Sequence, residues 1–154
     1  MSRAFVKEHD EMRAGELPDR LISPHPNLVS AEGLRQIEAE VTRLTRQYAE
    51  AQSSDNREDL AVAVRDLRYW TQRRATAEVI APPKDAAAVH FGSKVTIRRD
   101  DGRRQTYRIV GEDEADPAKG TLSFVSPLAM ALMGKKVGET VRAGPSAAEL
   151  VEIG

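Results

Sequence analysis

The sequence predicts an α+β protein in which an antiparallel helical hairpin, a short coiled coil, is followed by a small antiparallel β-sheet domain with one helix. Two heptad-spaced series of apolar residues around a short polar turn indicate the hairpin. Short β-branched and aromatic segments between glycine and aspartate turns indicate the sheet. Because Pro82 and Pro83 cannot continue a helix, we place an extended or flexible arm at 1–29, the hairpin at 30–80 and the sheet domain at 81–154.

Composition excludes several classes of protein. The 154 residues suffice for one domain or two small ones, and they are too few for a large enzyme. With 24 acidic against 23 basic side chains, the chain is no polycation, so any partner must be recognised locally. The absence of cysteine excludes disulfides and cysteine-based zinc sites. Without a long apolar run or a signal-peptide core, we expect a soluble cytoplasmic protein with no membrane contact.

The arm at 1–29 shows no sustained period and contains Pro18, Pro24 and Pro26. Two interpretations remain open. The arm is either mobile or docked on a folded surface, since a proline-rich extended segment loses little entropy on ordering. The apolar side chains available for docking are Phe5, Leu17, Leu21 and Ile22.

The hairpin begins at Ser30, a plausible N-cap. Apolar residues then recur at alternating spacings of three and four, as a helical seam requires. The seam of the first helix is Leu34, Ile37, Val41, Leu44, Tyr48 and Ala51, and that of the second is Leu60, Val64, Leu67 and Trp70. The polar run at 52–56 separates the two helices, so we expect them to be antiparallel.

The sheet domain contains strand-like segments joined by turns. Those segments are 89–92, 94–98, 105–110, 121–125, 137–141 and 149–153. The turn at 100–102 indicates a β-hairpin. Ser126 and Pro127 predict an N-cap and the first position of a short apolar helix, which Gly134 ends.

Several motifs of the second half resemble the C-terminal domain of the Gre transcription elongation factors. They are Phe91-Gly92-Ser93-Lys94-Val95-Thr96-Ile97, then Gln105 to Asp116 with its Ile109-Val110-Gly111-Glu112-Asp113-Glu114 centre, then Ser123-Phe124-Val125-Ser126-Pro127-Leu128-Ala129 and Leu132-Met133-Gly134-Lys135. The resemblance implies an FKBP-like fold for 81–154 that docks on bacterial RNA polymerase near its secondary channel. It implies that Ser126, Pro127 and Leu128 belong to the polymerase-binding surface and that the protein is not itself an enzyme.

In the Gre family an acidic pair at the hairpin tip is thought to help polymerase hold a second Mg²⁺ during cleavage of backtracked RNA. Asp55 and Glu58 have the matching spacing, although Ser54 stands where the family has glycine. Oxygen ligands suit Mg²⁺. We therefore expect no catalytic residue or metal of the chain's own, and Mg²⁺ only within a polymerase complex. The alternative is structural, since Asp55 and Glu58 also fit a capping box at the start of the second helix.

The hairpin is shorter than in the cleavage factors. As we align it, each helix lacks about ten residues, which shortens its reach by roughly 15 Å. The shorter reach favours a factor that modulates elongation without stimulating cleavage. It also resembles Rnk-type regulators of nucleoside diphosphate kinase, so such a regulator, or another protein-interaction module, is the alternative function.

Four arginines of the second helix form a candidate basic stripe. They are Arg65, Arg68, Arg73 and Arg74. Such a stripe could contact nascent RNA in the channel. The alternative is a solvated surface with salt bridges to nearby acids such as Asp66.

Overall fold

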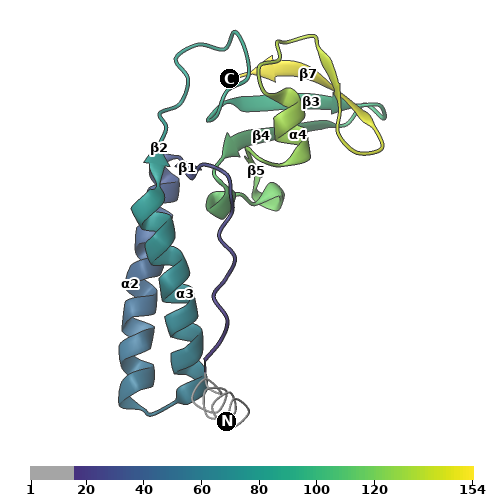
Figure 1. Cartoon of the computed structure of the whole chain (residues 1–154). Coiled ribbons are helices and arrows are strands. Elements are labelled where there is room, and N and C mark those ends of the chain that lie inside the picture. The colour runs from purple at the N-terminus through teal and green to yellow at the C-terminus, as the bar shows by residue number, and fades with distance from the viewer. Residues whose placement is uncertain (1–15) are drawn as a thin grey trace, which may run out of the picture. The chain divides into compact units, whose positions relative to one another are not determined.

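The computed structural model describes residues 16–154, which form two compact units (Figure 1). Residues 16–23 and Ile37–Ala75 make up the hairpin unit, and Pro24–Gln36 together with Thr76–Gly154 make up the sheet unit. The division therefore cuts the first helix, whereas the sequence pattern places that whole helix in the hairpin. No helix in the described part of the chain is both long and apolar enough to cross a membrane.

The hairpin consists of α2 (Ala31–Ser53) and α3 (Arg57–Thr76), which lie side by side in Figure 1. Four of the six predicted seam residues of α2 are buried (Ile37, Val41, Leu44 and Ala51), and the other two, Leu34 and Tyr48, are half-buried. On α3 the buried side chains are instead Ala63 and Arg73. The predicted α3 seam at Leu60, Val64, Leu67 and Trp70 is only half-buried. The apolar stripe of α3 is thus wider than α2 alone covers.

A second small sheet joins the segments that precede α2 and follow α3. It pairs β1 (Leu28–Val29) with β2 (Glu78–Val79) in parallel. These strands could not be predicted from the sequence, because two residues carry no alternating pattern. The arm therefore gives way to paired structure before residue 30, and α3 ends at Thr76, four residues before the predicted end of the hairpin.

The sheet unit contains five strands in the order β5-β4-β3-β7-β6. They are β3 (Lys94–Arg99), β4 (Arg104–Val110), β5 (Thr121–Ser123), β6 (Thr140–Arg142) and β7 (Ala147–Ile153). The predicted β3–β4 hairpin is confirmed, and the pairs are antiparallel except at β4–β5. That exception arises because two single-turn 3₁₀ helices, Glu112–Glu114 and Pro117–Lys119, occupy the crossover.

The predicted strand at 89–92 is a turn. Gly92 has a φ of 87°, and a Cβ there would lie 3.2 Å from the Cα of Pro82. Such a backbone conformation favours glycine and ends an extended segment. The apolar Val89 nevertheless belongs to the hydrophobic core, so the pattern identified burial correctly and strand structure wrongly.

One helix, α4 (Pro127–Leu132), packs its buried Ala129 and Leu132 on the core of the sheet unit. The Ser126 hydroxyl accepts a hydrogen bond from the backbone N–H of Ala129 at 3.3 Å, and Pro127 follows it. Both features of the predicted helix start are therefore confirmed. The core face of the sheet comes from alternate residues, among them Val95, Ile97, Ile109, Leu122, Ala148 and Leu150.

Glu114 connects this sheet unit to the start of α2. Its carboxylate accepts hydrogen bonds from the backbone N–H of Ser30 at 2.9 Å, from that of Gly111 at 3.2 Å, and from the Ser30 hydroxyl. The same hydroxyl accepts from the N–H of Gly33 at 2.9 Å, which confirms Ser30 as the N-cap. These bonds explain why Pro24–Gln36 groups with the sheet unit.

Candidate functional site

The turn between α2 and α3 carries the first candidate site residue, Asp55, in a left-handed backbone conformation with a φ of 53°. The N–H of Asn56 donates to the carbonyl of Ala51 at 3.1 Å, and the N–H of Ser54 donates to that of Glu50 at 3.0 Å. This closure is a Schellman-type helix end, in which the left-handed position is usually glycine. Asp55 thus ends α2 and does not begin α3.

The capping box predicted for Asp55 and Glu58 is wrong by one residue. Asn56 is the N-cap, because its Oδ1 accepts from the Asp59 N–H at 3.2 Å and its Nδ2 donates to Asp59 Oδ2 at 2.9 Å. Asp and Asn are both good N-caps, but an N-cap residue needs an extended backbone, which the left-handed φ of Asp55 does not provide. The structural role assigned to the acidic pair therefore belongs to Asn56 and Asp59.

The carboxylates of Asp55 and Glu58 are consequently available to a partner. Both residues are exposed, and neither carboxylate forms a hydrogen bond or an ion pair with residues 16–154. No group of three or more potential metal ligands exists in this part of the chain. Two carboxylates can contribute oxygen ligands to a cation whose remaining ligands come from elsewhere, and they are too few to form a complete Mg²⁺ site.

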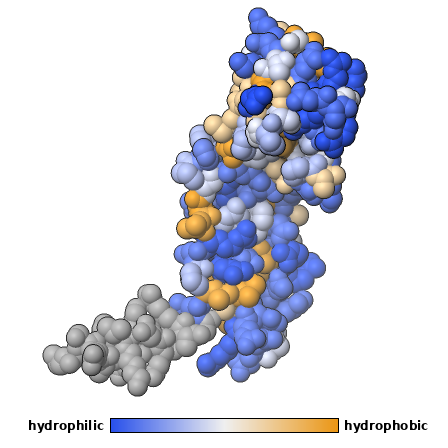
Figure 2. Space-filling model, turned by 90° about the vertical axis from the view of Figure 1, so that its right-hand side faces the viewer, coloured by the Kyte–Doolittle hydropathy of each residue, from blue (hydrophilic) through white to orange (hydrophobic). Residues whose placement is uncertain are grey.

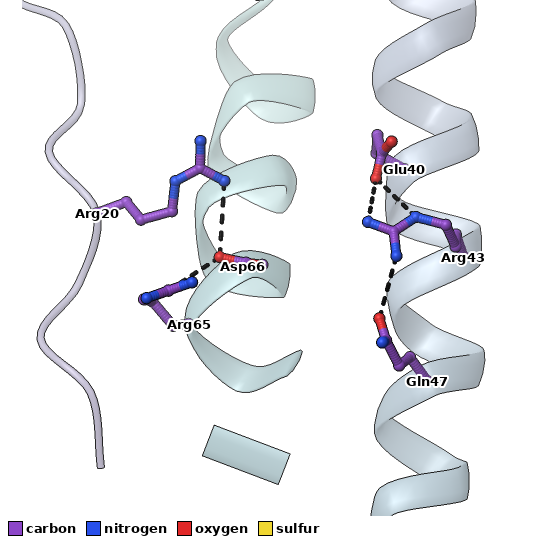
Figure 3. Close-up of polar contacts among 6 residues, drawn as sticks. All are labelled: Arg20, Glu40, Arg43, Gln47, Arg65 and Asp66. Atoms are coloured by element: carbon purple, nitrogen blue, oxygen red, sulfur yellow. Dashed lines mark hydrogen bonds and ion pairs between the residues drawn. The ribbon is translucent and has the colours of Figure 1, made fainter. Parts of the chain in front are cut away.

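The candidate basic stripe is not continuous. The Arg73 side chain is only 1% exposed, so this residue does not belong to a surface. Arg65 Nε pairs with Asp66 at 3.0 Å (Figure 3), and Arg68 pairs with Asp19 at 3.3 Å. Arg74 is the exposed arginine for which no pair among the described residues is found. On α2, Arg43 likewise lies between Glu40 and Gln47.

The predicted polymerase-binding residues surround the start of α4. Pro127 is exposed, Leu128 is half-buried against the core, and the Ser126 hydroxyl is occupied by its cap. Met130, one helical turn further, is 61% exposed. Pro127 and Met130 therefore form the apolar surface that α4 offers. Sequence reasoning missed Met130 because a helix of six residues does not reveal from its pattern which apolar side chain points outward.

Comparison with known proteins decides the family. Residues 84–153 match the model of the C-terminal domain of the transcription elongation factors GreA and GreB. A GreA of Desulfovibrio desulfuricans is 32% identical over 132 residues, covering 73% of this chain and 82% of that protein. The chain belongs to the GreA/GreB family. The Gre-type elongation factors are thereby favoured over the alternative of a nucleoside diphosphate kinase regulator.

Other relatives of this Gre-family chain match over shorter stretches. A GreB of Neisseria meningitidis serogroup B is 42% identical over 92 residues, covering 58% of this chain and 56% of that relative. The chain thus spans about half the length of the first curated relatives it matches. Among solved structures, GreA factor homolog 1 of Thermus thermophilus aligns with a TM-score of 0.41 at 17% identity, over 84% of this chain and 99% of that one.

The Gre-family hairpin of this chain holds the described part of its arm, residues 16–23, along α3. The Arg20 guanidinium lies 3.9 Å from the centroid of the Tyr69 ring and 5.8 Å from that of Trp70. Arg20 also pairs with Asp66 at 3.6 Å, as Figure 3 shows. The docked interpretation is confirmed for these residues, with Arg20 and Asp19 making the polar contacts, whereas Leu21 is 95% exposed. Phe5 lies outside the described residues.

A groove of about 1090 Å³ separates the arm from the helices. Leu60, Val64 and Leu67 of α3 line it together with Leu17 and Ile22 of the arm. In the view of Figure 2, hydrophobic patches accordingly interrupt a largely hydrophilic surface. Sequence reasoning missed Asp19 and Arg20 because their partners lie almost fifty residues away, and no local pattern reveals such a contact.

Proposed function

We propose that this Gre-family chain is a transcription elongation factor that binds bacterial RNA polymerase at its secondary channel and modulates elongation. Family membership, carried by the match that covers 82% of the D. desulfuricans GreA, is the observation on which the proposal rests. The α4 surface with Pro127 and Met130 is the proposed contact with polymerase, because it combines exposed apolar side chains with a capped, rigid helix.

Co-purification with core RNA polymerase tests this contact. In Pro127→Glu/Met130→Glu both substitutions lie on the surface, and glutamate at the first helical position is compatible with the helix dipole. We expect at least a tenfold loss of binding. The control, Leu21→Glu, adds charge at an equally exposed apolar residue of the arm and is expected to bind as the parent does. Absence of binding by the parent protein would contradict the proposal itself.

The hairpin is the proposed channel element. Its helices of 23 and 20 residues span about 34 and 30 Å. We propose that the acidic tip enters the channel and that the short reach keeps Asp55 and Glu58 from completing the Mg²⁺ site of polymerase. If the reach suffices, the two free carboxylates would supply oxygen ligands to that ion. The exposed Arg74 is the remaining stripe residue for contact with nascent RNA.

Stalled, backtracked elongation complexes with Mg²⁺ distinguish a protein that only occupies the secondary channel from one that stimulates cleavage of the transcript. We expect the protein to change the lifetime of the pause without shortening the transcript. We also expect a full-length cleavage factor to displace it from polymerase in competition. Any cleavage that does occur should disappear in Asp55→Asn/Glu58→Gln and persist in Asp85→Asn/Asp100→Asn. The control pair is exposed, lies in the sheet unit and removes the same charge. Cleavage that survives the tip substitutions would remove the acidic pair from the mechanism.

A further inference from the structure

The solvent-facing side of the sheet carries basic residues in an unfavourable arrangement. Residues directly opposite one another on antiparallel strands share a face and have neighbouring side chains. The register of β3 and β4 places Lys94 opposite Arg108 and Arg98 opposite Arg104. Like charges in such pairs destabilise a sheet. Two like-charged pairs on one face therefore require a physical explanation beyond the fold.

The four cations are exposed and only partly compensated. Arg98 pairs with Glu149 of β7, and Arg108 donates to the Gly92 carbonyl at 2.9 Å. Within residues 16–154 the side chains of Lys94 and Arg104 form neither a hydrogen bond nor an ion pair. Glu152, opposite Thr96, is a further acid on this side of the sheet. The four cations thus outnumber the two carboxylates that the register places on the neighbouring strand β7, although the whole chain has a formal charge of −1.

The geometry of the two basic pairs is regular. They are four residues apart along β3, a separation of about 13 Å, and the two members of each pair are neighbours about 5 Å apart. Thr96 and Thr106 lie between the pairs, with hydroxyl oxygens 2.9 Å apart. The face thus presents two dibasic positions separated by hydroxyl groups. Each position suits an anionic oxygen cluster such as a phosphate.

We propose that the face formed by Lys94, Thr96, Arg98, Arg104, Thr106 and Arg108 binds the phosphodiester backbone of duplex DNA, independently of sequence. The separation of the basic pairs is close to the width of the major groove, about 12 Å, so each pair can contact one of the two backbones. The aromatic Tyr107 packs on the opposite, core side of β4. Without an aromatic platform the face is poorly suited to single strands, which are usually held by base stacking.

This site does not depend on the proposed contact with polymerase. All six residues lie on strands of the sheet unit, and α4 packs on the other face of that sheet. A failure of DNA binding would therefore leave the polymerase proposal intact, and the reverse also holds.

Fluorescence anisotropy with a labelled duplex of random sequence, titrated with the full chain between 50 and 200 mM salt, tests the proposal. Four phosphate contacts correspond to a slope of log Kobs against log salt of about −3.6. In Lys94→Ala/Arg104→Ala we expect the slope to become less negative by about 2 and the affinity at low salt to fall at least tenfold. The charge-conserving Lys94→Arg/Arg104→Lys should bind as the parent does.

The matched control is Arg46→Ala/Lys84→Ala, which removes one arginine and one lysine from exposed positions that lie outside the strands of the sheet. It should retain the parent affinity and slope. Three results would overturn the proposal: no binding of duplex at low salt, an equal loss in the control, or binding of a single strand of the same sequence as tightly as duplex. Displacement of DNA by polyglutamate at equal charge concentration would also overturn it, since the face would then recognise acidic protein.

Discussion

At the scale of single residues, Asp55 combines an unfavourable backbone with an unused carboxylate. A left-handed φ is strained for any residue that has a Cβ, and glycine avoids this cost in free energy. The other positive-φ positions of the described chain are glycines. The side chain forms no hydrogen bond or ion pair within residues 16–154 that would offset this cost. An outlier of this kind at an exposed tip favours a role in binding.

Asp55→Gly should raise the free energy of unfolding by about 0.5–1 kcal/mol, because glycine adopts the left-handed conformation without strain. Urea denaturation measures this change. Asp55→Asn, which tolerates the same conformation, should leave stability nearly unchanged and serves as the control. A less stable Asp55→Gly would show that the carboxylate stabilises the turn.

The like-charged pairs of the sheet offer a second test at this scale. Arg104→Glu replaces the repulsion from Arg98 by an attraction, and we expect a gain of about 0.2–1 kcal/mol in unfolding free energy. Thermal unfolding at low salt checks it. The same variant should bind duplex DNA more weakly. A protein that becomes more stable and loses binding would separate the function of this pair from its effect on the fold, whereas a loss of stability would contradict the repulsion.

At the scale of elements, the local sequence predicted what local interactions determine. Helix α2, the β3–β4 hairpin and the capped α4 follow from periodicity, turn residues and a Ser-Pro start. The β1–β2 pair, the parallel β5 and the contacts of Arg20 could not be predicted, because each depends on residues distant in sequence. At the tip, the two candidate acids are exposed, and the choice between Asp55 and Asn56 as the N-cap depended on a backbone angle that the sequence does not reveal.

The junction of α2 with the sheet unit gives a prediction about an element. Glycine within a helix normally costs about 1 kcal/mol relative to alanine. At Gly33, however, a Cβ would lie 2.1 Å from Glu114 Oε2, whose carboxylate holds Ser30 and Gly111. We expect Gly33→Ala to destabilise the protein by about 1 kcal/mol, because displacing the carboxylate weakens charge-assisted hydrogen bonds.

A double-mutant cycle measured by urea denaturation makes this prediction specific. In the Glu114→Ala background the obstacle is gone, so Gly33→Ala should become stabilising. Gln36→Ala, an exposed substitution on the same helix, should be nearly neutral in both backgrounds. If Gly33→Ala has the same effect with and without Glu114, the carboxylate does not constrain this position.

At the scale of the whole molecule, a formal charge of −1 conceals an uneven distribution. The tip presents two free carboxylates, and the sheet face presents four cations. The shaft between Leu60 and Ile80 is less basic than its sequence indicates. Arg73 is buried, and Arg65 and Arg68 pair with acids of α3 and of the arm. The arm thus contributes to the charge of the hairpin surface.

Salt should therefore weaken the attachment of the arm to α3. The pairs Asp19–Arg68 and Arg20–Asp66 are partly exposed, so their attraction is screened as ionic strength rises. Trp70, the single tryptophan, lies near Arg20, and its fluorescence should change between 0.05 and 1 M salt, a range over which the screening length falls to about 3 Å. In Asp19→Ala/Arg20→Ala the change should be absent. An unaltered response in this variant would show that the arm is held by other contacts.

The parallel pairing of β1 with β2 has a consequence for how hairpins of different length arise. Leu28 lies opposite Glu78, so the segments that precede α2 and follow α3 are held side by side. The part of the hairpin outside the sheet unit is Ile37–Ala75, and within it both helices can gain or lose whole heptads while β1 and β2 stay paired. One heptad added to each helix would lengthen the probe by about 10.5 Å. A series of such insertions, each longer by one heptad, would measure the hairpin length at which the acidic tip begins to act.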